Sequence, residues 1–177
     1  MVGRPEPSPG LFRRIDGLAR ALLPSILTSV LLVLAAGPSG VPALVPAMGL
    51  TSIFFWSIFR PGAVPPPVVF VLGALQDLLT MAPLGLGIIT LLLVHGVALA
   101  WRRFLARQSF LFVWLVFCGF AAGAAALSWM FTALLAWMVP PLPPALHHAA
   151  LMAGLYPAVA YLLGRVHAIM MRAEEQG

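Results

Sequence analysis

Residues 64–103 read VPPPVVFVLGALQDLLTMAPLGLGIITLLLVHGVALAWRR and contain Asp77, the single carboxylate between Gly17 and Ala173. Two apolar runs flank a short turn, residues 81–85, whose sequence Met-Ala-Pro-Leu-Gly is typical of a chain reversal. The first run places Gln76 and Asp77 a little more than one helical turn before that reversal. We therefore expect a helical hairpin that carries a buried acid near its tip.

Composition indicates the class of protein. Hydrophobic residues make up 62% of the chain, charged residues make up 8%, and the mean hydropathy is +1.02. Soluble globular domains are far more polar, so we expect an integral membrane protein. All ten basic residues are arginines, whose side chains reach the bilayer surface and bind lipid phosphate. The basic charge therefore predicts contacts with membrane lipids and none with nucleic acid.

Apolar runs bounded by Pro, Gly and Arg predict an all-α protein with six transmembrane helices. We expect one membrane domain, residues 18–170, between a basic tail, 1–17, and a short tail, 171–177. The expected helices are residues 21–36, 41–59, 66–81, 84–101, 110–138 and 145–170. The first run has a rival interpretation as a cleaved signal peptide, because Arg13 and Arg14 precede it and small residues follow it. No polar secreted domain comes next, so we favour a retained helix.

The arginines predict the orientation. With six helices, all ten fall on one side: four within residues 1–20, then Arg60, Arg102, Arg103, Arg107, Arg165 and Arg172. The three opposite loops, 37–40, 80–83 and 139–144, contain none. Cytoplasmic loops carry the excess of positive charge, so we expect both termini in the cytoplasm.

Four residues form the candidate polar core: Asp77, Gln76, His147 and His148. Asp77 is either a structural acid, bonded to a neighbouring helix or to backbone near Pro83, or a site for an ion or polar ligand. We favour the structural role. Its shallow depth makes water, His147 or His148 the expected partners. The membrane part offers no carboxylate pair and no nucleophile with a base, so we expect no enzyme, cofactor or metal site.

Other residues are assigned to packing. Pro83, Gly85 and Gly87 belong to the hairpin turn and its exit. Gly119 and Gly123 form a small-xxx-small pair that lets a helix approach closely, either within the chain or from another subunit. Phe54, Phe55, Trp56 and Phe59 precede Arg60, a pattern typical of side chains at a membrane–water interface.

These residues also carry a family resemblance. Residues 72–79, LGALQDLL, followed by residues 82–87, APLGLG, resemble the G-x-x-x-D-x-L…P-L-G hairpin of the rod shape-determining MreD family. Residues 55–61, FWSIFRP, and 101–104, WRRF, are similar to the ends of that family's neighbouring helices.

The resemblance implies a non-enzymatic component of the bacterial cell-elongation machinery. Its expected partners are MreC and, through it, a peptidoglycan transpeptidase, a glycosyltransferase and the actin-like MreB. Members are similar in fold to the six-helix substrate-binding subunits of energy-coupling-factor vitamin transporters. That similarity supplies the alternative function, a solute-binding subunit in which Asp77, Gln76 and the histidines line an outward cavity. In the scaffold interpretation, residues 64–103 form the packing core.

The predicted orientation can be tested by thiol labelling of intact cells. In a Cys118→Ala background, we expect Leu142→Cys to react with an impermeant reagent and Ala106→Cys to stay unlabelled, because the arginines flank only Ala106. Labelling of Ala106→Cys in sealed cells would contradict the orientation.

Overall fold

The computed structural model describes residues 11–37, 41 and 43–175, and every regular element in this part is helical. The predicted all-α class is confirmed for these residues. The elements are α1 (Leu11–Ala35), α2 (Leu44–Phe59), the 3-10 turn η1 (Pro61–Ala63), α3 (Pro66–Thr80), α4 (Leu86–Leu105), α5 (Phe110–Ala136) and α6 (Leu142–Glu175). Helices α4, α5 and α6 are long and apolar enough to cross a membrane, whereas α2, α3 and the apolar part of α1 are shorter.

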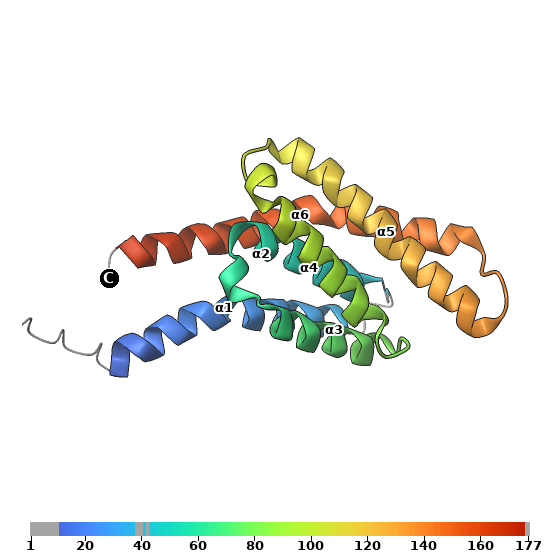
Figure 1. The fold of residues 1–177 in the computed structure, drawn as a ribbon, viewed down its shortest axis with the longest axis horizontal. Helices are drawn as coiled ribbons and strands as arrows, with labels where there is room; N and C mark the ends of the chain where they lie inside the picture. Colours follow the sequence, from blue (N-terminus) through green and yellow to red (C-terminus); the bar gives the residue numbers. More distant parts are fainter. Residues whose placement is uncertain (1–10, 38–40, 42, 176–177) are drawn as a thin grey trace, which may run out of the picture.

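The helices run back and forth between two ends of a bundle (Figure 1). Helices α1, α3 and α5 finish at one end, and α5 and α6 project beyond the other helices there. The opposite end holds the start of α1, the α4–α5 turn and the end of α6. Arg60, Arg102, Arg103 and Arg172 belong to the helix ends and turns on this second side.

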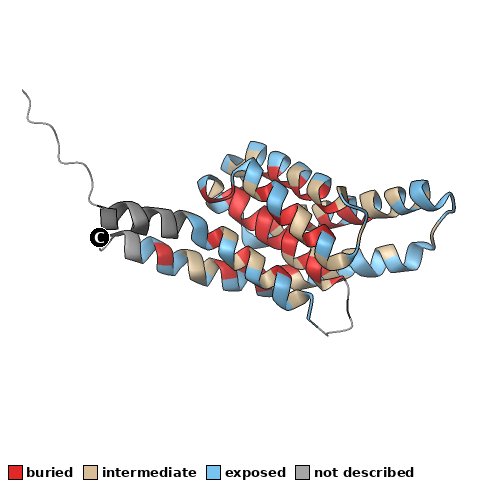
Figure 2. Ribbon diagram, turned by 90° about the horizontal axis from the view of Figure 1, so that it is seen from below, coloured by how far each residue is buried: buried red, intermediate tan, exposed pale blue. Residues whose placement is uncertain are grey.

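Helix α2 forms the centre of the bundle, because it contacts α1, α3, α4, α5 and α6. Buried residues are concentrated in the middle of the bundle, and the α5–α6 end is largely exposed (Figure 2). The expectation that residues 64–103 form the packing core is therefore wrong: the hairpin packs beside a central α2.

The aromatic residues at the end of α2 are also placed differently from the prediction. Phe54, Phe55 and Trp56 are buried, so they are core residues and not interface residues, while Phe59 is partly exposed. The Phe54 ring lies 5.3 Å from the Phe117 ring and 5.9 Å from the Tyr156 ring. These edge-on contacts join α2 to α5 and α6.

Several helix ends differ from the prediction. The prediction took the ends of apolar runs as helix ends, but a helix can continue into polar residues beyond an apolar run. Helix α1 begins at Leu11, so part of the expected tail is helical and Pro24 lies in the helix interior. Helix α4 continues through Arg102 and Arg103. Helix α6 begins at Leu142 and includes Pro143 and Pro144. Proline is tolerated there because the N–H groups of a helix's first turn have no partner within the helix. Residues 1–10 of the expected tail and 38–40 of the expected first loop lie outside the described residues.

Pro157 lies inside α6 and has no N–H, so the carbonyl of Ala153 loses its helical partner. The indole N–H of Trp114, on α5, donates to that carbonyl at 2.8 Å. A hydrogen bond between helices thus replaces one that the proline removes, and it fixes α5 against α6 at this level.

Gly73 permits the close approach of α3 and α4. A Cβ atom at this position would lie 2.6 Å from Cα of Ile88 and 2.9 Å from its backbone nitrogen. Backbone atoms cannot turn aside as a side chain can, so any larger residue would force the two helices apart.

We predict that Gly73→Ala destabilises the protein, because overpacking typically costs about 1–3 kcal/mol. The matched control is Gly96→Ala on α4, where a Cβ would meet nothing within 4 Å. There alanine should stabilise the helix by up to ~1 kcal/mol. Thermal unfolding in detergent measures both effects, and equal midpoints for the two variants would contradict the prediction.

Candidate functional site

The carboxylate of Asp77 joins the two helices of the hairpin. Its Oδ2 accepts a hydrogen bond from the Gly85 N–H at 2.8 Å, and its Oδ1 accepts one from the Gly87 N–H at 2.7 Å. These N–H groups belong to the start of α4, where a helix leaves its first donors without backbone partners. Asp77 therefore caps α4 from a different helix, and its negative charge lies at the positive end of the α4 dipole.

The turn between the helices has the backbone geometry that this cap requires. Met81 ends α3 in the left-handed region with φ 52°, and Gly85 precedes α4 with φ 111°. Glycine adopts the latter conformation without strain. At Gly87 a Cβ atom would collide with Oδ1 of Asp77. Gly85 and Gly87 thus have separate roles: one forms the turn and the other leaves space for the carboxylate.

Gln76 is buried beside Asp77, and its side chain lies between two glycines. A Cβ at Gly87 would lie 2.9 Å from its Nε2, and a Cβ at Gly49 of α2 would collide with its Oε1. Although Gln76 is only 5% exposed, its Oε1 has no hydrogen-bond partner among the described residues.

A cavity of about 200 Å³ lies between α2, α3, α4, α5 and α6, and we call it the Asp77 cavity. Its walls combine leucine, alanine and methionine side chains with six polar ones. The polar residues are Gln76, Asp77, Thr80, Thr90, Ser128 and His148. The Thr80 and Thr90 hydroxyls donate to carbonyls of their own helices, so their oxygens remain available as acceptors.

The structure separates the two histidines of the predicted polar core. His148 lines the Asp77 cavity together with Asp77 and Gln76. His147 is exposed, does not line the cavity, and has its Nδ1 2.7 Å from the carbonyl of Pro143. Among the described residues, Asp77 has no hydrogen bond to either histidine; its two carboxylate oxygens accept the N–H groups of Gly85 and Gly87.

His95 forms a second buried polar contact, deeper in the bundle. Its Nδ1 lies 2.8 Å from Oγ of Ser57, which itself donates to the Ile53 carbonyl. Since the hydroxyl proton is already used, Nδ1–H must be the donor in the His95–Ser57 bond. This bond joins α4 to α2.

The residues missed by sequence reasoning are Thr80, Thr90 and Ser128. Serine and threonine inside apolar helices commonly bond to their own backbone, so their sequence positions do not predict which of them face a cavity. Among the described residues, no three histidine, cysteine or acidic side chains are close enough to hold a metal ion.

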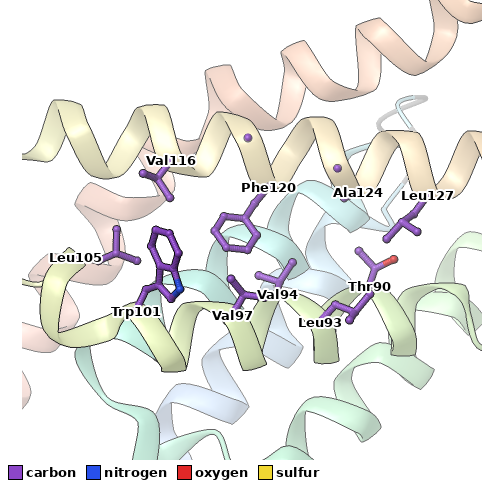
Figure 3. A pocket seen from close by; sticks show the side chains of 12 residues that line it. Thr90, Leu93, Val94, Val97, Trp101, Leu105, Val116, Phe120, Ala124 and Leu127 are labelled. Atoms are coloured by element: carbon purple, nitrogen blue, oxygen red, sulfur yellow. The ribbon is translucent and has the colours of Figure 1, made fainter.

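Gly119 and Gly123 lie on α5 and do not pack against another helix of this chain. A Cβ at either position would meet nothing within 4 Å. Both line an apolar groove of about 470 Å³ between α4 and α5, the α4–α5 groove, which Figure 3 shows from close by. Of the two packing roles expected for this pair, the contact within the chain is therefore absent, and a contact between subunits stays a prediction.

Comparisons of this chain with protein-family models, curated proteins and solved structures found no match. The resemblance to the MreD family and the likeness to transporter subunits therefore stay predictions.

We predict that replacing Asp77 destabilises the protein in proportion to the acceptors lost. Asn keeps one acceptor and Leu keeps none, and each unpaired buried group costs about 1–3 kcal/mol. The stability of Asp77→Asn should therefore lie between those of the wild-type protein and Asp77→Leu, and Asp77→Leu should be the least stable of the three. Thermal unfolding and abundance in the membrane provide the measurements.

Gln76→Met is the neighbouring control, because it keeps side-chain length and removes no hydrogen bond between described residues. Wild-type stability of Asp77→Leu would show that the cap on α4 is dispensable.

Proposed function

We propose that the protein is a non-enzymatic scaffold of the MreD type in the bacterial inner membrane. It crosses the membrane six times with both termini in the cytoplasm. It links MreC to the peptidoglycan transpeptidase and glycosyltransferase of the cell-elongation complex, with MreB as an indirect partner. Its contribution to cell shape is assembly of these proteins and not chemical turnover.

The observation that carries this proposal is the projecting end of α5 and α6, residues 130–146, which we call the distal hairpin. Most of its side chains are apolar and exposed, with Trp137 at 91% and Val139 at 81%. Contiguous exposed apolar surface of this kind commonly marks a protein or membrane interaction site. An exposed aromatic side chain such as Trp137, once a partner buries it, is a typical centre for an interface.

The length of α5 supports the same interpretation. Its 27 residues extend about 40 Å, whereas the hydrocarbon core of a bilayer is about 30 Å thick. With the arginine-rich end in the cytoplasm, the distal hairpin faces the periplasm. That is the compartment in which the family's partner MreC forms its scaffold.

The role of Asp77 also favours a scaffold. The residues that carry the resemblance, Gly73, Asp77, Gly85 and Gly87, form one set of contacts that holds α3 to α4. A motif that serves helix packing is compatible with assembly and provides no reactive group.

A second candidate function is solute binding, and the Asp77 cavity is the observation that favours it. The cavity has a volume of about 200 Å³, polar groups on several helices, and the unpaired Oε1 of Gln76 in its wall. A hydrogen bond to a ligand would satisfy that oxygen.

The proposal is tested by affinity purification from native membranes with mass spectrometry. We expect MreC and wall synthases in the eluate, and we expect Trp137→Ser/Val139→Ser to lower MreC recovery about tenfold or more, as loss of an aromatic interface residue does. Depletion of the protein should make rod-shaped cells round without impairing vitamin uptake.

Met81→Ser/Leu84→Ser is the matched control. Met81 ends its helix with the same φ of 52° as Trp137 and is 92% exposed, but it belongs to the α3–α4 turn. If both double variants lowered MreC recovery equally, the distal hairpin would not be the specific contact with MreC. Recovery of no wall-synthesis partner, together with vitamin binding that Gln76→Met abolishes, would favour the solute-binding function instead.

A further inference from the structure

The α4–α5 groove is an apolar channel on the side of the bundle. Its α4 wall extends from Thr90 to Leu105, about 22 Å along the helix. In Figure 3, Trp101, Val97 and Val94 rise from α4 toward Val116 and Phe120 of α5. On the α5 side, Gly119 and Gly123 line the groove without side chains, so no atoms fill the space beside them.

Three arginines lie at one end of this groove. Arg102 follows the lining residue Trp101, Arg103 comes next, and Arg107 lies in the turn between α4 and α5. None of the three has a hydrogen bond or ion pair to another residue in the part of the chain that the structure describes. Helices α4 and α5 and the turn between them contain no acidic residue. The end of the groove therefore carries positive charge, and no acidic residue of α4, α5 or their turn neutralises it.

We propose that the α4–α5 groove binds one anionic glycerophospholipid of the surrounding bilayer, with an acyl chain along the groove and its phosphate at Arg102 and Arg107. The inference does not rest on the scaffold function; it takes from the proposal only the cytoplasmic position of the arginine-rich end.

The dimensions agree with this occupant. An acyl chain of one leaflet spans about half of the ~30 Å hydrocarbon core, so it fits within the length of the groove. Arginine forms paired hydrogen bonds with phosphate oxygens, and basic pockets between membrane helices are established positions for anionic lipid headgroups. Trp101 lies beside the arginines, at the level that tryptophan favours in membrane proteins.

Charge favours a lipid over a transmembrane helix of another protein. The segments that flank membrane helices on the cytoplasmic side are usually basic, and such a segment would be repelled by Arg102, Arg103 and Arg107. A phosphodiester brings the opposite charge.

Brominated lipids test the inference, because bromine on an acyl chain quenches tryptophan fluorescence at contact. Purified full-length protein is reconstituted into phosphatidylcholine nanodiscs that contain a small fraction of brominated phosphatidylglycerol or brominated phosphatidylcholine. The quenching difference between wild-type protein and Trp101→Phe reports on the groove. We expect brominated phosphatidylglycerol to quench Trp101 at a lower fraction than brominated phosphatidylcholine.

Arg102→Gln/Arg107→Gln should reduce this preference about fivefold per arginine removed. The control Arg165→Gln/Arg172→Gln removes equal charge from α6 and should leave the preference unchanged. Gly123→Leu should reduce Trp101 quenching by either lipid, since leucine fills the groove. If Gly123→Leu does not fold, the arginine comparison alone decides.

Equal quenching by the two lipids in wild-type protein would overturn the inference. So would identical loss of preference in the two arginine variants. Failure of both lipids to quench Trp101 would overturn it as well, and it would indicate that a helix from a second copy or another protein covers the groove.

Discussion

The hydrogen bonds of Asp77 are the constraint on which the hairpin depends. A carboxylate inside an apolar bundle is stable only if its oxygens are paired, and a helix that begins inside the bundle needs acceptors for its first N–H groups. The pairing of Asp77 with Gly85 and Gly87 meets both needs. The small residues around it follow from this arrangement, because Gly87 leaves room for the carboxylate and Gly73 lets α3 approach α4.

The parts that sequence predicted well are those set by neighbours along the chain. Asp77 and the turn are separated by only a few residues, so a buried acid close to turn backbone could be expected from helix geometry alone. Which of His147 and His148 shares a cavity with Asp77 could not be predicted, because it depended on the rotation of α6 about its axis. No local pattern determines that rotation; packing against α2 and α5 does.

The aromatic end of α2 illustrates the same limit. Aromatic residues before an arginine are typical of an interface, yet Phe54 and Trp56 are fully buried. Their burial comes from α5 and α6, which follow much later in the sequence and cover this face. The cavity was likewise not predictable in detail, since Thr90 and Ser128 reach it from different helices.

The central position of α2 has a consequence for biosynthesis. Thr51, Ser52 and Ser57 place buried hydroxyl groups on different sides of this helix in the finished protein. While the ribosome has made only the first two helices, neither α4 nor α6 exists to cover them. Every nascent chain therefore passes through a stage in which its second helix depends on lipid, the insertion machinery or a chaperone. A chain that ends before α6 would leave part of α2 uncovered, because α6 packs directly against it.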